Sequence, residues 1–148
     1  MRYIPGYRHR VQYYETDQMG VVHHSNYIRW FEEGRTDYME KLGLSYAVME
    51  DSGIMCPVLE VESRYLRMVY YGDTVRIDTA VQEYNGIKLT VGYEITSENT
   101  NMVHCRGITK HCFMASDGRP LSLKQKSPEF HEIFLEGLEI YKAKNKEE

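Results

Sequence analysis

A carboxylate, a glycine and two histidines are gathered in the segment YYETDQMGVVHHSNY, from Tyr13 to Tyr27. Asp17 precedes the expected start of a helix by a few residues, and Gly20 between them allows the backbone to turn back sharply. A helix start carries unpaired N–H groups and a partial positive charge, which together bind and polarise a carbonyl oxygen. A carboxylate beside such a helix end has the minimum equipment for acyl transfer, as a base or as a nucleophile.

The same residues also have interpretations in which they play no part in catalysis. Asp17 can simply cap a turn by accepting hydrogen bonds from local backbone, as aspartates in loops commonly do. His23 and His24 are either partly exposed surface residues or side chains that orient a substrate and shuttle protons near neutral pH. A metal site made of Asp17 and both histidines is disfavoured, because adjacent histidines seldom reach one ion without a further anchored ligand.

The pairs His104-Cys105 and His111-Cys112 also contain residue types that bind metals. On one strand, Cys105 and His111 share a face but lie some 20 Å apart, at about 3.3 Å per residue. His104 and Cys112 face the other way. We therefore expect neither a metal nor a cofactor.

The elements that must position these groups begin with a long helix over residues 26–43, NYIRWFEEGRTDYMEKLG. Ser25 or Asn26 is expected to cap its start, and Gly43 suits the left-handed position after its last turn. Gly34 lowers helix propensity, which a close approach to a sheet would explain. Apolar residues at spacings of three and four predict one buried stripe: Tyr27, Trp30, Phe31, Gly34, Tyr38 and Leu42.

After this helix, the spacing at which apolar residues repeat changes from 3.6 residues to two residues. Alternating apolar residues predict antiparallel strands over residues 75–81 and 87–95. Asn85-Gly86 between them suits a two-residue type I′ hairpin turn.

Further strands are expected within residues 54–68 and 102–114, and a first strand would turn Tyr13 and Tyr14 to opposite faces. Residues 128–142 then form a short last helix, which opens with a proline and an acidic residue. The order is strand, long helix, four strands in a meander and short helix. One antiparallel sheet must curl round the apolar helix to bury both, which gives an α+β fold.

Composition limits the class of protein. With 148 residues, 42% of them hydrophobic and 27% charged, the chain suits a single globular domain over residues 1–148. A net charge of −4 without any dense basic run argues against nucleic acid as a partner. No run suits a signal peptide or a membrane span, and three unpaired-looking cysteines suggest reduced thiols, so we expect a cytoplasmic protein. Motifs for dinucleotides, P-loops, hydrolase elbows and zincins are absent from the sequence.

The segment VQYYETDQMGVVHHSNY, followed by IRWFEEGRTD, resembles the signature of hot-dog-fold acyl-CoA thioesterases of the 4-hydroxybenzoyl-CoA thioesterase type. The Tol-Pal-associated subgroup is the nearest, and the resemblance is dense over about residues 11–43. It implies a curved antiparallel sheet of about five strands wrapped round one long central helix. Two positions depart from the signature: Glu15 replaces the first aspartate of the usual Asp-Thr-Asp, and His23 stands where an aromatic residue often sits.

The resemblance also implies roles and partners. Asp17 matches the catalytic carboxylate, the backbone N–H of His24 lies where the thioester oxygen binds, and Tyr13 matches a supporting tyrosine. The implied partners are an acyl-CoA substrate and a second copy of the chain, in a homodimer or homotetramer with shared active sites. Candidate substrate-binding residues are Gly20, Val22, His23, Asn26, Tyr27, Trp30 and Arg64.

Several alternatives accompany this hypothesis. Trp30 and Phe31 either wall the acyl pocket or belong to the core. The basic side chains proposed for the CoA phosphates are explained equally well as solvated strand faces: Arg64, Arg67, Lys88 and Lys110. A non-catalytic acyl-CoA-binding protein would keep the pocket without needing Asp17, an acyl-carrier-protein thioesterase would change only the carrier, and a hydratase-type enzyme would need a longer motif that is absent.

Overall fold

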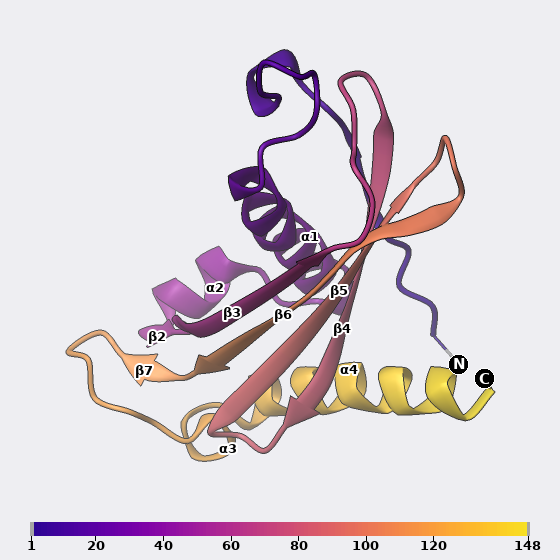
Figure 1. The fold of residues 1–148 in the computed structure, drawn as a ribbon. Coiled ribbons are helices and arrows are strands. Elements are labelled where there is room, and N and C mark those ends of the chain that lie inside the picture. The colour runs from indigo at the N-terminus through magenta and orange to yellow at the C-terminus, as the bar shows by residue number, and fades with distance from the viewer. Residues whose placement is uncertain (1, 148) are drawn as a thin grey trace.

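A long helix packed against a curved sheet dominates the protein, seen here in a computed structural model that describes residues 2–147 (Figure 1). Helix α1 (Ser25–Leu42) follows strand β1 (Tyr7–Arg10), and helix α4 (Pro128–Glu147) closes the chain. Two short helices that the sequence did not predict are α2 (Tyr46–Asp51) and α3 (Leu123–Lys126). In Figure 1, α1 and α2 lie on one side of the sheet, and α4 passes along strand β4.

The sheet has five antiparallel strands in the order β1-β4-β5-β6-β3, which confirms the predicted fold class. A separate two-stranded sheet pairs β2 (Ile54–Met55) with β7 (Met114–Ala115). The remaining strands of the large sheet are β3 (Val58–Tyr65), β4 (Thr74–Tyr84), β5 (Lys88–Ser97) and β6 (Met102–Cys112).

The predicted four-stranded meander was wrong in one respect. Strands β4, β5 and β6 do follow one another as hairpins, but β3 pairs with β6 instead of with β4. Strand β4 already has β1 on one side and β5 on the other, with Tyr7 opposite Ile77 and Ile77 opposite Ile95. The free edge of β6 is therefore the place where β3 can join the sheet.

The core lies between α1 and the sheet, and Gly34 explains how closely they approach. A Cβ atom added at Gly34 would lie 2.5 Å from Cγ2 of Ile77 on β4, so any larger residue would push the helix away. One turn earlier, the fully buried Phe31 stacks on Tyr93 of β5 with ring centroids 4.5 Å apart. This packing fixes the height of α1 above the sheet and confirms the predicted apolar stripe.

The hairpin at Asn85-Gly86 forms as predicted, but its turn is not type I′. A type I′ turn needs a positive φ at both central residues, and of these two only Gly86 has one, at 90°. The Asn85 side chain instead accepts hydrogen bonds from the backbone N–H groups of Ile87 and Lys88, at 2.9 and 2.7 Å. A longer loop capped by a side chain therefore replaces the tight turn.

Two predictions near the start of α1 were also wrong. Strand β1 ends at Arg10, so Tyr13 and Tyr14 lie in a 3-10 turn (Tyr13–Glu15) and not on opposite faces of a strand. The N-cap of α1 is His24, whereas Ser25 and Asn26 belong to its first turn. Strand β1 ends earlier than predicted because the chain leaves the sheet after Arg10 to reach the start of α1.

Strand β1 pairs only with the first residues of β4, and helix α4 packs beside the rest of that strand. It begins at Pro128 as predicted and continues past Lys142 to Glu147. A Cβ added at Gly137 would lie 3.2 Å from both Val81 and Leu42, so α4 packs on β4 and on the end of α1. Within residues 2–147, no helix is long and apolar enough to span a membrane, and the three cysteines are free thiols.

Candidate active site

Asp17 lies at the start of a tight turn whose backbone hydrogen bonds close on each other. Its N–H donates to the carbonyl of Val21 at 2.9 Å, and its carbonyl accepts from Gly20 N–H at 3.0 Å. Gly20 has a φ of 76°, a conformation that a residue with a side chain adopts only with strain. Thr16 and Val22 then pair as an isolated antiparallel bridge. The turn therefore folds the chain back and brings Asp17 close to the start of α1.

The segment that connects β3 to β4 holds this turn from its other side. Val22 N–H donates to Val69 O at 2.8 Å, and Tyr71 N–H donates to Gly20 O at 3.2 Å. Val21 also pairs with Tyr70 as an isolated bridge. The segment following the edge strand therefore forms a second wall beside the turn.

A cavity of about 390 Å³ opens between these two walls. Five of the predicted site residues line it. The opposite wall comes from the end of β3 and the residues after it, among which the sequence analysis had named only Arg67, as one of four candidates for the CoA phosphates. The lining residues are Asp17, Val21, Val22, His23, His24, Tyr27, Tyr65, Leu66, Arg67 and Met68. The structure thus brings Asp17 and the start of α1 to one cavity.

The two oxygens of the Asp17 carboxylate differ in their surroundings. Oδ1 accepts a hydrogen bond from Met19 N–H at 2.8 Å, which is the turn-capping role that the sequence left open. Oδ2 has no hydrogen-bond donor among residues 2–147, and the side chain is exposed. One oxygen therefore holds the turn while the other is available to a substrate.

The start of α1 has an unpaired donor on His24, a residue that lines the same cavity. His24 has φ −56° and ψ −26°, and its N–H meets no acceptor within the described part of the chain. The neighbouring donors are occupied: Ser25 N–H lies 3.2 Å from His23 Nδ1, and Asn26 N–H donates to His23 O at 3.0 Å. The His24 N–H is thus free where the partial positive charge of the helix is concentrated.

Tyrosines close the cavity beside the helix start. The Tyr65 hydroxyl donates to the carbonyl of His24 at 3.3 Å, and its ring meets that of Tyr27 with centroids 4.9 Å apart. Burial raises the pKa of Tyr27 to about 12, so this phenol stays neutral at physiological pH. No local spacing in the sequence signals Tyr65, because it reaches the site only through the pairing of β3 with β6.

Other predicted site residues lie outside this cavity. Tyr13 is 79% exposed, with its ring 5.8 Å from that of Tyr71. Trp30 is fully buried, and its indole N–H donates to Glu15 Oε2 at 2.7 Å. Asn26 is buried and its amide donates to Glu15 O at 2.8 Å, while Gly20 shapes the turn.

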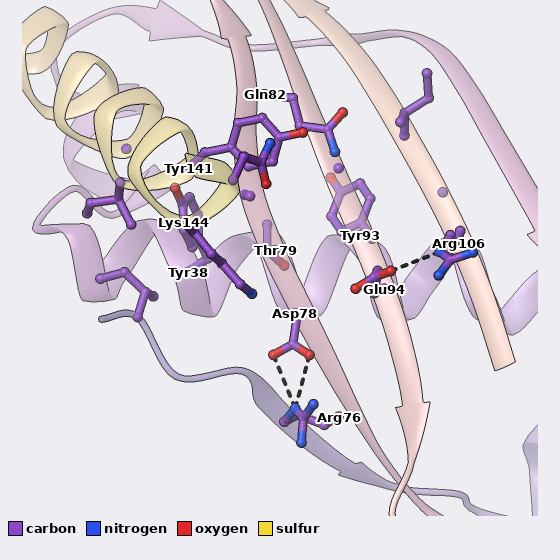
Figure 2. Close-up of a pocket in the computed structure, with 18 of the residues that line it drawn as sticks. Tyr38, Arg76, Asp78, Thr79, Gln82, Tyr93, Glu94, Arg106, Tyr141 and Lys144 are labelled. Atoms are coloured by element: carbon purple, nitrogen blue, oxygen red, sulfur yellow. Dashed lines mark hydrogen bonds and ion pairs between the residues drawn. The ribbon is translucent and has the colours of Figure 1, made fainter. Parts of the chain in front are cut away.

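Arg64 lines a different and larger cavity of about 850 Å³, which lies along α4, the N-terminal segment and the outer face of the sheet. Figure 2 shows this cavity with its strand side chains and with Tyr141 and Lys144 of α4. Dashed lines mark two ion pairs there, Arg76 with Asp78 and Arg106 with Glu94, at 3.0 and 2.8 Å.

The two histidines on β6 make internal contacts. His104 bonds through its two ring nitrogens with Thr100 Oγ1 at 2.7 Å and with Met68 O at 2.9 Å. His111 Nε2 lies 2.7 Å from Thr109 Oγ1. Over residues 2–147, the structure contains no group of three or more histidine, cysteine and acidic side chains placed to hold a metal.

Comparisons with known proteins agree with this architecture. Residues 11–138 match the model of the thioesterase-like superfamily. A candidate acyl-CoA thioesterase of Bacillus subtilis, YneP, is 34% identical over 125 residues, which cover 84% of this chain and 90% of the relative. The crystal structure of a DHNA-CoA thioesterase from Staphylococcus aureus superposes with a TM-score of 0.86 at 33% identity, covering 96% of this chain and 93% of the other. The acyl-CoA thioesterase YbgC of Haemophilus influenzae is 25% identical over 126 residues, covering 84% of this chain and 92% of the relative.

Proposed function

This chain belongs to the thioesterase-like superfamily, and from that premise we propose that it hydrolyses acyl-CoA thioesters to a free acid and CoA, with Asp17 as the catalytic carboxylate. The observation that carries this proposal is the pair of unpaired polar groups in one cavity. The free Oδ2 of Asp17 and the free N–H of His24 belong to residues that line the same 390 Å³ space. Within the superfamily, the Tyr13-to-Tyr27 signature suggests the 4-hydroxybenzoyl-CoA thioesterase type.

The mechanism follows from where charge develops. The thioester carbonyl oxygen accepts a hydrogen bond from His24 N–H, where the positive end of α1 stabilises the negative charge of the tetrahedral intermediate. In one route, Asp17 attacks the carbonyl carbon to form an anhydride and expel the CoA thiolate, and water then cleaves the anhydride to release the free acid and restore Asp17. In the other route, Asp17 removes a proton from the water that attacks the carbonyl carbon, and the tetrahedral intermediate then expels the CoA thiolate. Both routes require Asp17 to be ionised.

The other lining residues shape the substrate path. Val22, Tyr27 and Tyr65 give an apolar wall next to the helix start, which suits an acyl group or the thioester itself. Arg67 is the one arginine or lysine lining this cavity within residues 2–147, and its Nη1 donates to Val103 O at 2.8 Å. We assign it to an anionic oxygen of the substrate.

A second copy of the chain is part of this proposal. Strand β3 lies at the open edge of the sheet, and nearly all of its residues are exposed. Val58 and Leu59 on it are 47% and 57% exposed. An exposed apolar edge strand is a template for pairing with another strand. We propose that two subunits, in a homodimer or a homotetramer, pair along β3, which places Tyr65 and the cavity beside the partner subunit.

The proposal is tested by measuring thiol release from a panel of aromatic, short-chain and long-chain acyl-CoAs. We expect turnover with at least one of them, and Asp17→Asn should lower kcat at least about 10²-fold because it removes the negative charge while keeping the side-chain shape. Circular dichroism of the variant should match that of the parent. Tight retention of acyl-CoA without any turnover would instead identify a binding protein.

A further inference from the structure

The buried carboxylate of Glu15 connects three separate segments around the candidate site. Glu15 is 4% exposed, and its Oε1 accepts from the Gln12 N–H at 2.8 Å and lies 2.8 Å from His9 Nε2. Its Oε2 accepts the indole N–H of Trp30 at 2.7 Å. One side chain thus joins β1, the 3-10 turn and the second turn of α1.

The main chain of the same residue makes a second connection to α1. Glu15 O accepts from His23 N–H at 2.9 Å and from the Asn26 amide at 2.8 Å. These contacts hold the segment at the start of the helix, whereas the Trp30 contact holds it one turn further along. A single contact would leave the segment free to rotate, but two contacts on successive turns fix both its distance and its angle.

Asp17 follows Glu15 by two residues, and the bridge from Thr16 to Val22 transmits the fixed geometry to the turn. We propose that Glu15 is a positioning residue that sets the distance between the Asp17 carboxylate and the free N–H of His24. This inference rests on the proposed function, because the distance matters only if both groups act on one thioester. A displacement of about 1 Å in such an arrangement can cost about 10²-fold in rate.

The chemistry of the buried contacts explains why a carboxylate is required. Gln12 N–H, the Trp30 indole and the His9 ring all present N–H donors, and only a carboxylate can accept from all of them. The His9 ring, whose Nε2 lies 2.8 Å from the Glu15 carboxylate, is 5.2 Å from the ring of Trp30. A glutamine would turn an N–H₂ group toward one of these donors, so at least one contact must break.

The first experiment compares Glu15→Gln with its parent by steady-state kinetics. We expect kcat to fall about tenfold or more while KM changes less than about twofold, because substrate contacts remain but reacting groups are misaligned. Trp30 is the single tryptophan of the chain, so its fluorescence emission should also shift when the Glu15 contact changes. Glu98→Gln is the matched control, because Glu98 accepts two hydrogen bonds from Arg8 elsewhere on the sheet and should leave kcat unchanged.

Trp30→Phe provides a milder second variant, which keeps an aromatic ring in the core and removes only the indole donor. It should reproduce part of the loss in kcat, and the double variant with Glu15→Gln should lose no more than the stronger single one. A lowered melting temperature with parental kcat in both variants would reduce Glu15 to a structural role and overturn the inference. If the parent is active, Asp17→Asn loses activity and Glu15→Gln keeps it, only the role of Glu15 is refuted. If the parent itself is inactive on every acyl-CoA, the proposed function is refuted as well.

Discussion

Two cavities of this protein, one more than twice the volume of the other, differ in whether their polar groups already have partners. The larger one, about 850 Å³, is rich in charge, but Arg76 pairs with Asp78 and Arg106 pairs with Glu94. The smaller one, about 390 Å³, is lined by Asp17 and His24, which have a carboxylate oxygen and a backbone N–H without partners among residues 2–147. Polar groups that are already paired have little interaction energy left for a transition state, whereas unpaired and fixed groups do. Chemistry is therefore expected in the smaller cavity.

The strongest contrast should come from removing one carboxylate charge in each cavity. Asp17→Asn should lower kcat at least about 10²-fold, whereas Asp78→Asn should change it less than about twofold, since a partly exposed ion pair contributes little. Thiol release under matched conditions measures both. Equal losses in the two variants would break the distinction between the cavities.

A second contrast separates the backbone of His24 from its side chain. His24 occupies the second position of a turn in which His23 O accepts from Asn26 N–H, and its φ of −56° suits proline. His24→Pro removes the free N–H and should lower kcat about 10²-fold, whereas His24→Ala keeps it and should cost only a few-fold. Similar kinetics for the proline variant and the parent would exclude this N–H as the oxyanion donor.

Acid should weaken the core without involving either cavity. Burial lowers the pKa of His111 to about 4, below its ordinary value of 6.5. The unfolded chain therefore binds this proton more readily, so stability is full above about pH 6.5 and falls as the pH drops toward 4. We expect a loss of about 2 kcal/mol between pH 7 and pH 5, measured by urea unfolding. The loss should be absent in His111→Gln, and a loss of equal size there would place the responsible group elsewhere.

The smallest effect concerns two arginines close together in sequence. Arg67 lines the smaller cavity and Arg64 lines the larger one. Arg67→Gln should raise KM for acyl-CoA about threefold to tenfold through loss of a charged hydrogen bond, while Arg64→Gln should leave KM unchanged. Kinetics at two salt concentrations would sharpen the result, since only the Arg67 contact should weaken with salt. Of these two arginines, both of which the sequence analysis considered for the CoA phosphates, the reverse pattern would favour Arg64.

Local patterns predicted the main elements because they reflect backbone geometry. The spacing of Tyr27, Phe31 and Gly34 predicted α1 and its buried face, since any helix repeats every 3.6 residues. Alternation predicted β4 and β5 in the same way. The turn at Asn85-Gly86 was placed correctly but given the wrong type, because its conformation depends on a side-chain cap as well as on glycine.

The candidate site was only partly predictable, because some of its residues are close in sequence and others are brought in by strand pairing. Asp17, Gly20 and His24 lie within one short segment, so their proximity follows from a turn and a helix start. Tyr65 and Arg67 enter the site from the other end of the sheet, and no spacing in the sequence relates them to Asp17. Long-range neighbours are decided by which strands pair, and each pairing depends on all the others.

What the sequence determined by itself was therefore the set of elements and the reactive segment, because both arise from contacts between residues close in the chain. The tertiary structure decided that β3 joins β6, that Trp30 turns inward to Glu15 and that Arg64 faces the other cavity. These outcomes depend on competition for burial and for strand edges among segments far apart in sequence. That competition is settled only when the whole core is packed.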